Sequence, residues 1–161
     1  MSIDPLLALL RSKARHTHKE LGEILSLTED EVRARIADWE NDGTIVGYQA
    51  VIDPERAGDQ DVSAFIEVKL TPERGGGFDR LALRIARFEQ VSSCYLASGG
   101  YDLMVVVEGT DLREVARFVS ERLSTMDGVL STATHFRLKT YKENGFLIEG
   151  NDEPERLAVT P

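Results

Sequence analysis

The residues best suited to hold a small molecule form a short glycine-containing segment between two β-rich runs, residues 91–97 and 103–107. Gly99 and Gly100 leave room for a ligand to approach backbone N–H groups, which can hold a carboxylate. Asp102 could take an ammonium group through a charge-assisted hydrogen bond. The same residues also suit a tight β-hairpin, in which Asp102 only braces the turn. Both interpretations remain open from the residues alone.

Two hydroxyl groups near the end of the chain could serve the same ligand. Thr132 and Thr134 alternate within the last predicted strand, residues 129–141, so they share one face of that strand. We therefore expect them to lie near the glycine-containing segment if the predicted strands form one sheet.

The first third of the chain holds the cations that could contact DNA. Arg33 is the best candidate, because Val32 and Ile36 face the core and leave Arg33 on the outside. Residues 1–60 nevertheless hold seven Lys and Arg against twelve Asp and Glu, and residues 29–31 are all acidic. Such carboxylates stabilise a helix start and repel phosphates, although one can accept a hydrogen bond from cytosine N4. The alternative is that these cations form only a solvated face.

The residue types of a metal centre or a nucleophilic enzyme are present but dispersed. His16 and His18 are the only histidines with metal-ligand spacing, and His135 is far away in sequence. Cys94 lies within a predicted strand with no base beside it, so we expect a small core or interface residue. Residues 75–77 are all glycine but lack the lysine and hydroxyl residue of a phosphate loop. We expect no enzyme activity, metal or cofactor.

Composition limits the class of protein. The chain of 161 residues is 42% hydrophobic and 29% charged, which is typical of one ordinary globular domain or two small ones. It has no apolar run long enough to span a bilayer, no secretory signal is expected, and a single cysteine suits a reducing cytoplasm. The formal net charge of −9 opposes non-specific attraction to DNA.

Three helices are predicted before residue 43. Asp4-Pro5 begins the first, and capping-box patterns at residues 17–20 and 28–31 begin the second and third. Gly43 ends the third helix, and residues 45–52 alternate like a short β-ribbon. This pattern is typical of a winged helix-turn-helix, and a three-helix packing module without nucleic acid is the alternative.

The rest of the chain predicts a βαββαβ order. Residues 61–70 read as a strand, and Phe78, Leu81, Ile85 and Phe88 give a helix with one apolar face. A hairpin follows, then a helix capped by Asp111 with Leu112, Val115, Val119 and Leu123 inward, and finally the strand at residues 129–141. The helices can cover one face of such a sheet. We expect Phe65, Phe136 and either Tyr95 or Cys94 on the other face, which should pair with a second copy.

Three blocks of the sequence resemble the leucine-responsive/asparagine regulator family, Lrp/AsnC. Residues 27–48 look like the end of its helix-turn-helix and its wing, residues 98–105 like the turn of its effector domain, and residues 132–145 like its last strand. The resemblance covers about residues 3–146 with all elements in order. It implies a prokaryotic transcription regulator that dimerises through its effector domains, often assembles into octamers, and binds amino acids near the loop that here is 99–102.

The residues and the resemblance together predict an α+β protein. A winged helix-turn-helix at residues 1–52 is joined by a linker at 53–60 to a ferredoxin-like effector domain, also called a RAM domain, at 61–148. An acidic flexible tail follows at 149–161. The expected function is a cytoplasmic DNA-binding transcriptional regulator that responds to an amino acid or related effector. The alternative is an oligomeric metabolite sensor with weak or no DNA binding.

The candidate site residues fall into two sets. The expected DNA-binding residues are Lys13, Arg15, His16, Lys19, Thr28, Arg33 and Arg35. The expected effector-binding residues are Ser98, Gly99, Gly100, Tyr101, Asp102, Thr132 and Thr134. The expected partners are double-stranded DNA, a small effector and further copies of the chain, as a dimer or an octamer.

Overall fold

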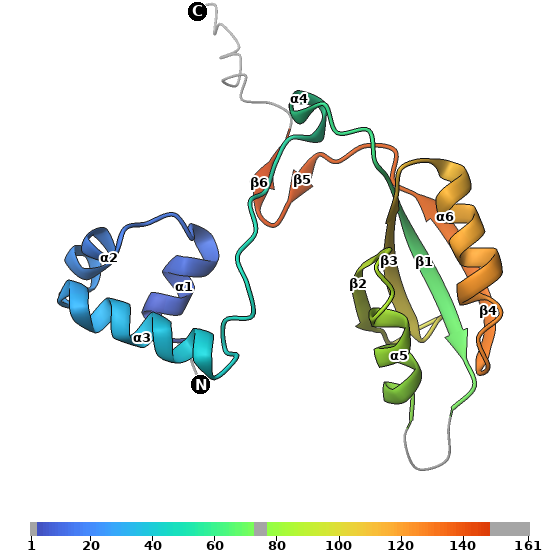
Figure 1. Cartoon of the computed structure of the whole chain (residues 1–161), viewed down its shortest axis with the longest axis horizontal. Coiled ribbons are helices and arrows are strands. Elements are labelled where there is room, and N and C mark those ends of the chain that lie inside the picture. Colours follow the sequence, from blue (N-terminus) through green and yellow to red (C-terminus); the bar gives the residue numbers. More distant parts are fainter. Residues whose placement is uncertain (1–2, 73–76, 149–161) are drawn as a thin grey trace, which may run out of the picture. The chain divides into compact units, whose positions relative to one another are not determined.

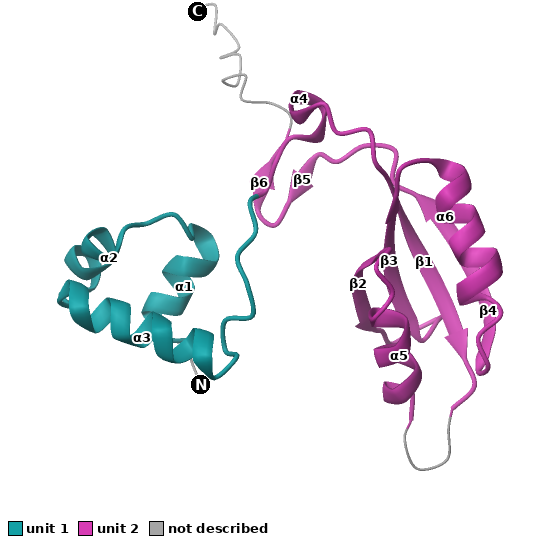
Figure 2. Ribbon diagram, viewed as in Figure 1, with its two compact units in different colours: residues 1–50 teal, residues 51–161 magenta. Residues whose placement is uncertain are grey.

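The structure, a computed structural model, describes residues 3–72 and 77–148. The chain divides into two compact units, residues 1–50 and residues 51–161 (Figure 2). The predicted tail at 149–161 lies outside the described residues.

The first unit contains the three predicted helices, α1 (Pro5–Ser12), α2 (His18–Leu25) and α3 (Glu29–Asn41) (Figure 1). Each begins after a side chain that accepts a hydrogen bond from the first helical turn, these being Asp4, Thr17 and Thr28. One small core joins the three helices through the buried residues Leu6, Leu10, Leu21, Val32 and Ile36. The predicted helical pattern of this unit is confirmed.

The turn between α2 and α3 is tight because two backbone groups meet inside it. The Leu27 N–H donates to the Gly22 carbonyl at 2.9 Å, and Ser26 takes the left-handed conformation with a φ of 57°. Gly22 is buried, and a Cβ added to it would lie 2.6 Å from the Leu27 carbonyl oxygen. The turn therefore depends on a residue without a side chain at position 22.

Replacing Thr28 by alanine is expected to lower the free energy of unfolding of the first unit by about 1 kcal/mol, because the N-cap of α3 is lost. The Thr28 Oγ1 accepts from the Glu31 N–H at 3.2 Å. Trp39 is the only tryptophan and packs against the core of this unit, so its fluorescence during urea titration reports this unit. Thr28→Ser keeps the hydroxyl and should restore most of the loss. An equal loss in both variants would assign the effect to something other than the cap.

The predicted β-ribbon at residues 45–52 is wrong. Residues 46–53 form no strand. The segment instead forms hydrogen bonds to the end of α3. The Ile45 N–H donates to the Trp39 carbonyl at 2.9 Å, and the Tyr48 hydroxyl donates to Glu40 at 2.8 Å. An isolated alternating run is unstable as a strand without a partner to complete its ladder. Val46 is accordingly 95% exposed.

The main sheet of the second unit is antiparallel with strand order β2-β3-β1-β4, the ferredoxin-like arrangement that the sequence predicts (Figure 1). Its strands are β1 (Val62–Leu70), β2 (Val91–Leu96), β3 (Leu103–Gly109) and β4 (Val129–Phe136). Its helices are α5 (Asp79–Ala86), α6 (Leu112–Phe118) and the π-helical turn η1 (Val119–Leu123) that continues α6. The α5 helix packs against β2, and α6 packs against β3 and β1.

One face of the sheet forms the core of this unit with the helices. Alternate strand residues are fully buried there, and they include Ala64, Ile66, Val68, Leu103, Val105 and Val107. On the opposite face Phe65 is 38% and Tyr95 is 59% exposed. The helices α5 and α6 pack on the core face, so they leave Phe65 and Tyr95 uncovered, as predicted.

The predictions for Phe136 and Leu112 are wrong, and the choice left open between Tyr95 and Cys94 falls on Tyr95. Phe136 pairs with Ala64 in the register of β1 and β4, so it lies on the helix-covered face and packs against the core. Cys94 pairs with Val105 on that same face, which leaves Tyr95 on the other. Leu112, expected to face inward, is 55% exposed because it is the first residue of α6.

The last predicted strand is too long. The β4 strand ends at Phe136 because β1 begins at Val62 and offers almost no further backbone for pairing. The chain then forms a small hairpin of β5 (Lys142–Glu143) and β6 (Phe146–Leu147). The expected linker at 53–60 contains a short helix, α4 (Pro54–Ala57), whose first turn is capped by the side chain of Asp53.

Candidate functional sites

The α3 helix presents Arg33 to solvent but holds its guanidinium in two ion pairs. Arg33 Nη1 donates to Asp30 Oδ1 at 2.8 Å, and Nη2 donates to Glu29 Oε1 at 3.1 Å. Val32 and Ile36 are buried, which fixes Arg33 on the outer surface. Three of the five guanidinium N–H groups remain for another acceptor, but the two carboxylates offset the charge of Arg33.

Most of the other candidate cations also have acidic neighbours. Lys13 and Arg15 are exposed in the segment between α1 and α2. Three further candidates lie within 4.0 Å of a carboxylate, in the pairs His16–Glu20, Lys19–Glu23 and Arg35–Asp4. Lys19, Arg33 and Arg35 thus each lie beside a carboxylate, whereas Lys13 and Arg15 are exposed.

Thr28, a candidate for DNA contact, has its hydroxyl engaged in the α3 cap. It donates to Glu31 Oε2 at 2.8 Å and accepts from the Glu31 N–H. The Thr28 N–H donates to the same carboxylate at 2.8 Å, and these hydrogen bonds lower the pKa of Glu31 below its ordinary value. The Glu20 carboxyl at the start of α2 has a lowered pKa for the same reason, through Thr17. The carboxylates of Glu20 and Glu31 therefore stay ionised into mild acid.

The glycine-containing segment forms the loop between β2 and β3, and it is tied to the end of β1. The Leu70 N–H donates to Asp102 Oδ2 at 2.7 Å, and the Asp102 N–H donates to the Val68 carbonyl at 3.0 Å. The Ala97 N–H donates to the Asp102 carbonyl at 2.8 Å and closes the loop. Gly99 has a φ of 138°, which restricts side chains there. Asp102 therefore braces a neighbouring strand as well as its own turn.

The remaining candidates of the effector set divide between the loop and β4. In the loop, Ser98, Gly99 and Gly100 are exposed, and Tyr101 is half-buried.

Thr132 and Thr134 lie opposite Val68 and Ile66 of β1, on the helix-covered face, and Thr132 Oγ1 is 3.0 Å from Ser124 Oγ. Since β1 separates β4 from the loop, the threonine backbones are about two strand spacings, about 10 Å, from Asp102. The structure brings Thr132 to the same end of the sheet but not into contact with Asp102.

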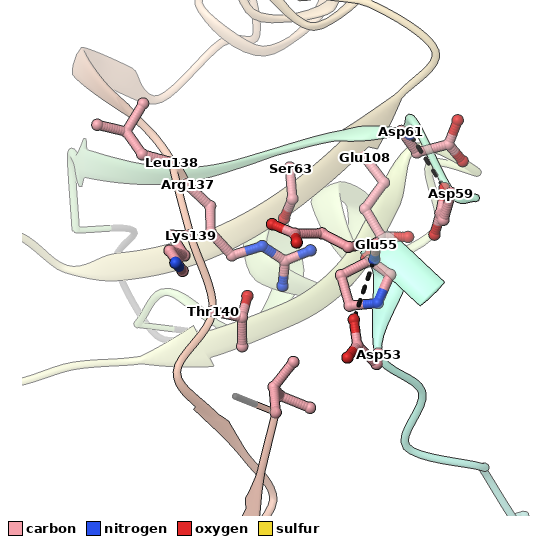
Figure 3. A pocket seen from close by; sticks show the side chains of 12 residues that line it. Asp53, Glu55, Asp59, Asp61, Ser63, Glu108, Arg137, Leu138, Lys139 and Thr140 are labelled. Carbon is pink, nitrogen blue, oxygen red and sulfur yellow. Dashed lines mark hydrogen bonds between the residues drawn. The ribbon is translucent and has the colours of Figure 1, made fainter. Parts of the chain in front are cut away.

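A pocket that sequence reasoning missed lies at the other end of β1. It has a volume of about 210 Å³, and its walls come from the α4 segment, the starts and ends of strands, and the segment after β4 (Figure 3). Its lining residues are Asp53, Pro54, Glu55, Asp59, Asp61, Ser63, Glu108, Arg137, Leu138, Lys139, Thr140 and Ile148. Strand register brings Ser63, Glu108 and Arg137 together, and no spacing in the sequence predicts that meeting.

Two other kinds of feature are absent from residues 3–72 and 77–148. No cluster of three or more His, Cys, Asp or Glu side chains in these ranges could hold a metal ion. No helix in the same ranges is long and apolar enough to cross a membrane.

Comparison with known proteins identifies relatives over nearly the whole chain. Residues 63–147 match the domain family described as the Lrp/AsnC ligand binding domain. A Bacillus subtilis protein named as an HTH-type transcriptional regulator, YugG, is 43% identical over 157 residues, which cover 97% of this chain and 95% of the relative. The proline dehydrogenase transcriptional activator of Rhizobium radiobacter is 26% identical, with 87% of this chain and 89% of the relative covered.

Solved structures give the same result. A transcriptional regulator from Neisseria meningitidis, solved as a complex with L-Met, aligns with a TM-score of 0.65 and 26% identity, over 88% of this chain and 94% of that one. The leucine response regulatory protein of Mycobacterium tuberculosis aligns with a TM-score of 0.69 and 27% identity, over 89% of this chain and 95% of that one. Both the helical unit and the sheet unit thus have relatives among transcriptional regulators.

Proposed function

The chain belongs to the Lrp/AsnC family of transcriptional regulators, and we propose that it binds DNA through its first unit and an amino-acid effector through its second. The observation that carries this proposal is the likeness to transcriptional regulators over 97% of the chain. The capped helix pair α2–α3 supports the DNA-binding role, because a helix-turn-helix places its second helix in the major groove. A gel-shift with DNA from upstream of the protein's own gene, at low salt, tests it.

The proposed DNA surface is α3 with the basic segment before α2. The candidate residues are Lys13, Arg15, His16, Lys19, Thr28, Arg33 and Arg35. We propose a cytoplasmic location and no enzymatic activity, in keeping with relatives that are named as transcriptional regulators.

Arg33→Ala is expected to weaken DNA binding by about 1 kcal/mol, the low end for an arginine that contacts a base, because Asp30 and Glu29 offset the charge of its guanidinium. The matched variant Glu29→Gln/Asp30→Asn frees Arg33 and removes two negative charges, so it should bind more tightly and with a changed salt dependence. Fluorescence anisotropy at several salt concentrations measures both. Unchanged affinity in Arg33→Ala would remove this side chain from the contact surface.

A second candidate function is favoured by one observation, the acidic start of α3. With Arg33 held by two carboxylates, the chain could act as an oligomeric metabolite sensor that binds DNA weakly or not at all. The gel-shift separates the two functions, because a sensor of this kind would give no shift at low salt while still binding its effector.

We propose that the protein forms a homodimer through the open face of the sheet, from which octamers could assemble. The face exposes Phe65 and Tyr95, whereas the α4 segment lines a pocket over its end at Ser63. Open apolar surface of this kind typically pairs with a partner, and a second copy offers the same surface by two-fold symmetry. His135 Nε2 and Glu67 Oε1, 3.3 Å apart on this face, add a polar pair within it.

The proposed effector site is the loop between β2 and β3 with the hydroxyls of β4. The loop residues are Ser98, Gly99, Gly100, Tyr101 and Asp102, and the hydroxyls are those of Thr132 and Thr134. The relative solved with L-Met supports an amino acid as the effector class. An effector at this position would change the assembly and thereby the way several DNA-binding units meet DNA.

Gly100→Ala is expected to reduce the thermal shift caused by the effector without lowering the melting temperature of the free protein. A Cβ at Gly100 meets nothing within 4 Å and needs no positive φ, so it blocks only an incoming ligand. Asp102→Asn removes the negative charge proposed to bind the effector's ammonium group. It keeps the fold contact, because the amide oxygen can still accept from the Leu70 N–H. The twenty amino acids are screened by thermal shift against wild type and both variants. Equal stabilisation of all three proteins would place the pocket elsewhere.

A further inference from the structure

The floor of the pocket at the start of β1 is formed by residues of three adjacent strand ends. Ser63 lies opposite Glu108 in the register of β1 and β3. On its other side the Arg137 N–H donates to the Ser63 carbonyl at 2.8 Å, continuing the β4 register by one residue. Directly opposed residues share a face of the sheet. A carboxylate, a hydroxyl and a guanidinium therefore lie in one row across the sheet, on the face that carries Phe65 and at the end that the α4 segment lines.

The hydroxyl at the centre of this row lacks a partner. Ser63 is only 3% exposed, and its Oγ has no hydrogen-bond partner among the described residues. Buried polar groups almost always have a hydrogen-bond partner, and an unpaired one destabilises the folded state. A ligand in the pocket that Ser63 lines could supply that missing partner.

The charged side chains around the row are mostly uncommitted. Asp53 caps α4 and pairs with Arg56. By contrast, the carboxylates of Glu55 and Glu108 and the guanidinium of Arg137 form no hydrogen bond or ion pair with the described residues. In Figure 3 the Arg137 side chain extends across the pocket toward the α4 segment. Arg137 can therefore meet an anion while carboxylates face the same space.

The balance of charge in the pocket selects the kind of ligand. Five carboxylates line it, those of Asp53, Glu55, Asp59, Asp61 and Glu108, against the two cations Arg137 and Lys139. A metal ion is not indicated, because no cluster of three or more metal-ligating side chains exists in the described residues. The volume of about 210 Å³ is below the roughly 300–1,000 Å³ of drug-sized sites, so the ligand is small.

We propose that this pocket binds a basic α-amino acid, with its α-carboxylate on Arg137 and its two ammonium groups on Glu108 and on the acidic wall of Glu55 and Asp61. The Ser63 hydroxyl donates to the same α-carboxylate. Ser63 and Leu70 are seven residues apart on β1, about 23 Å in an extended strand, so this site is distinct from the loop at Asp102. The proposal does not rest on the effector role of that loop.

Isothermal titration of the full-length protein with four probes tests the recognition of each charge. L-Lysine carries all three charges, L-norleucine lacks the side-chain ammonium, cadaverine lacks the carboxylate, and L-glutamate reverses the side-chain charge. L-Lysine should bind at least about tenfold more tightly than each of the others, since each loses a charge-assisted hydrogen bond. Equal binding of L-lysine and L-norleucine, or no binding of L-lysine, would overturn the proposal.

Two variants tie the binding to this pocket. Arg137→Gln should remove the preference for L-lysine over cadaverine, whereas Arg113→Gln, an exposed arginine on α6, should leave it unchanged. Ser63→Ala should weaken L-lysine binding several-fold while the melting temperature of the free protein stays the same or rises, because an unpaired hydroxyl is removed. A lower melting temperature for Ser63→Ala would show that the hydroxyl serves the fold, and that would contradict the proposal.

A third variant separates this site from the proposed effector loop. Asp102→Asn should keep the wild-type affinity for L-lysine, because the Asp102 carboxylate lies at the opposite end of β1. Loss of L-lysine binding in Asp102→Asn together with full binding in Arg137→Gln would assign the ligand to the loop and overturn the second site. DNA binding, measured separately, decides the proposed function whichever of these results is obtained.

Discussion

A Phe65→Glu variant is expected to elute as a single chain where the wild-type protein elutes as an oligomer. Phe65 lies on β1, at the centre of the open sheet face, between β3 and β4. In a two-fold dimer each copy would bring one carboxylate into the interface, and an uncompensated buried charge costs roughly 3–5 kcal/mol. Light scattering coupled to gel filtration at micromolar concentration measures the mass.

Leu83→Glu is the matched control for this result. Leu83 is 59% exposed on α5, on the helix side of the sheet, so the same new charge there should leave the dimer intact. If both variants become monomeric, added charge rather than the sheet face explains the change. A wild-type protein that is itself monomeric would remove the proposed interface.

Gly22→Ala is expected to destabilise the first unit by about 3 kcal/mol and to abolish specific DNA binding. The new Cβ would lie 2.6 Å from the Leu27 carbonyl oxygen, a backbone atom that cannot move without opening the turn between α2 and α3. Overpacking of this kind costs typically about 1–3 kcal/mol, and a backbone clash belongs at the upper end. Urea unfolding followed by Trp39 fluorescence measures the stability, and anisotropy measures the binding.

Gly47→Ala is the control within the same unit, since a Cβ at Gly47 meets nothing within 4 Å. It should leave stability and DNA affinity near the wild-type values. Retained DNA binding in Gly22→Ala would mean that the turn can open without displacing α3, and that the spacing of the two helices is not what DNA recognition requires.

Local signals in the sequence predicted most of the elements of the fold. The capping boxes at Thr17 and Thr28 work within one helical turn, so their outcome depends on residues three apart. The expected β-ribbon at 45–52 failed because a strand needs a partner, which no local pattern supplies. The last strand was predicted too long for the same reason, since β4 ends at Phe136, where β1 runs out.

The candidate sites show the same division between local and distant effects. The loop at Gly99 and Gly100 was visible as a turn, but the hydrogen bond from Leu70 to Asp102 joins residues 32 positions apart and could not be inferred. The pocket was missed entirely because Ser63, Glu108 and Arg137 meet only through the register of three strands. Each of these residues alone is an ordinary strand or loop residue.

The strand order of the sheet sets the sequence of events as the chain emerges from the ribosome. The first unit is complete by residue 50, and its contacts join nearby helices, so it can fold while the rest is still being made. The central strand β1 is synthesised next, but its neighbours β3 and β4 follow later. Ala64 of β1, for example, pairs with Phe136 of β4, which is made only near the end of the chain. Until then the apolar residues of β1 have no sheet to join. The nascent second unit therefore passes through an interval in which β1 is exposed to chaperones and to pairing with strands of other chains.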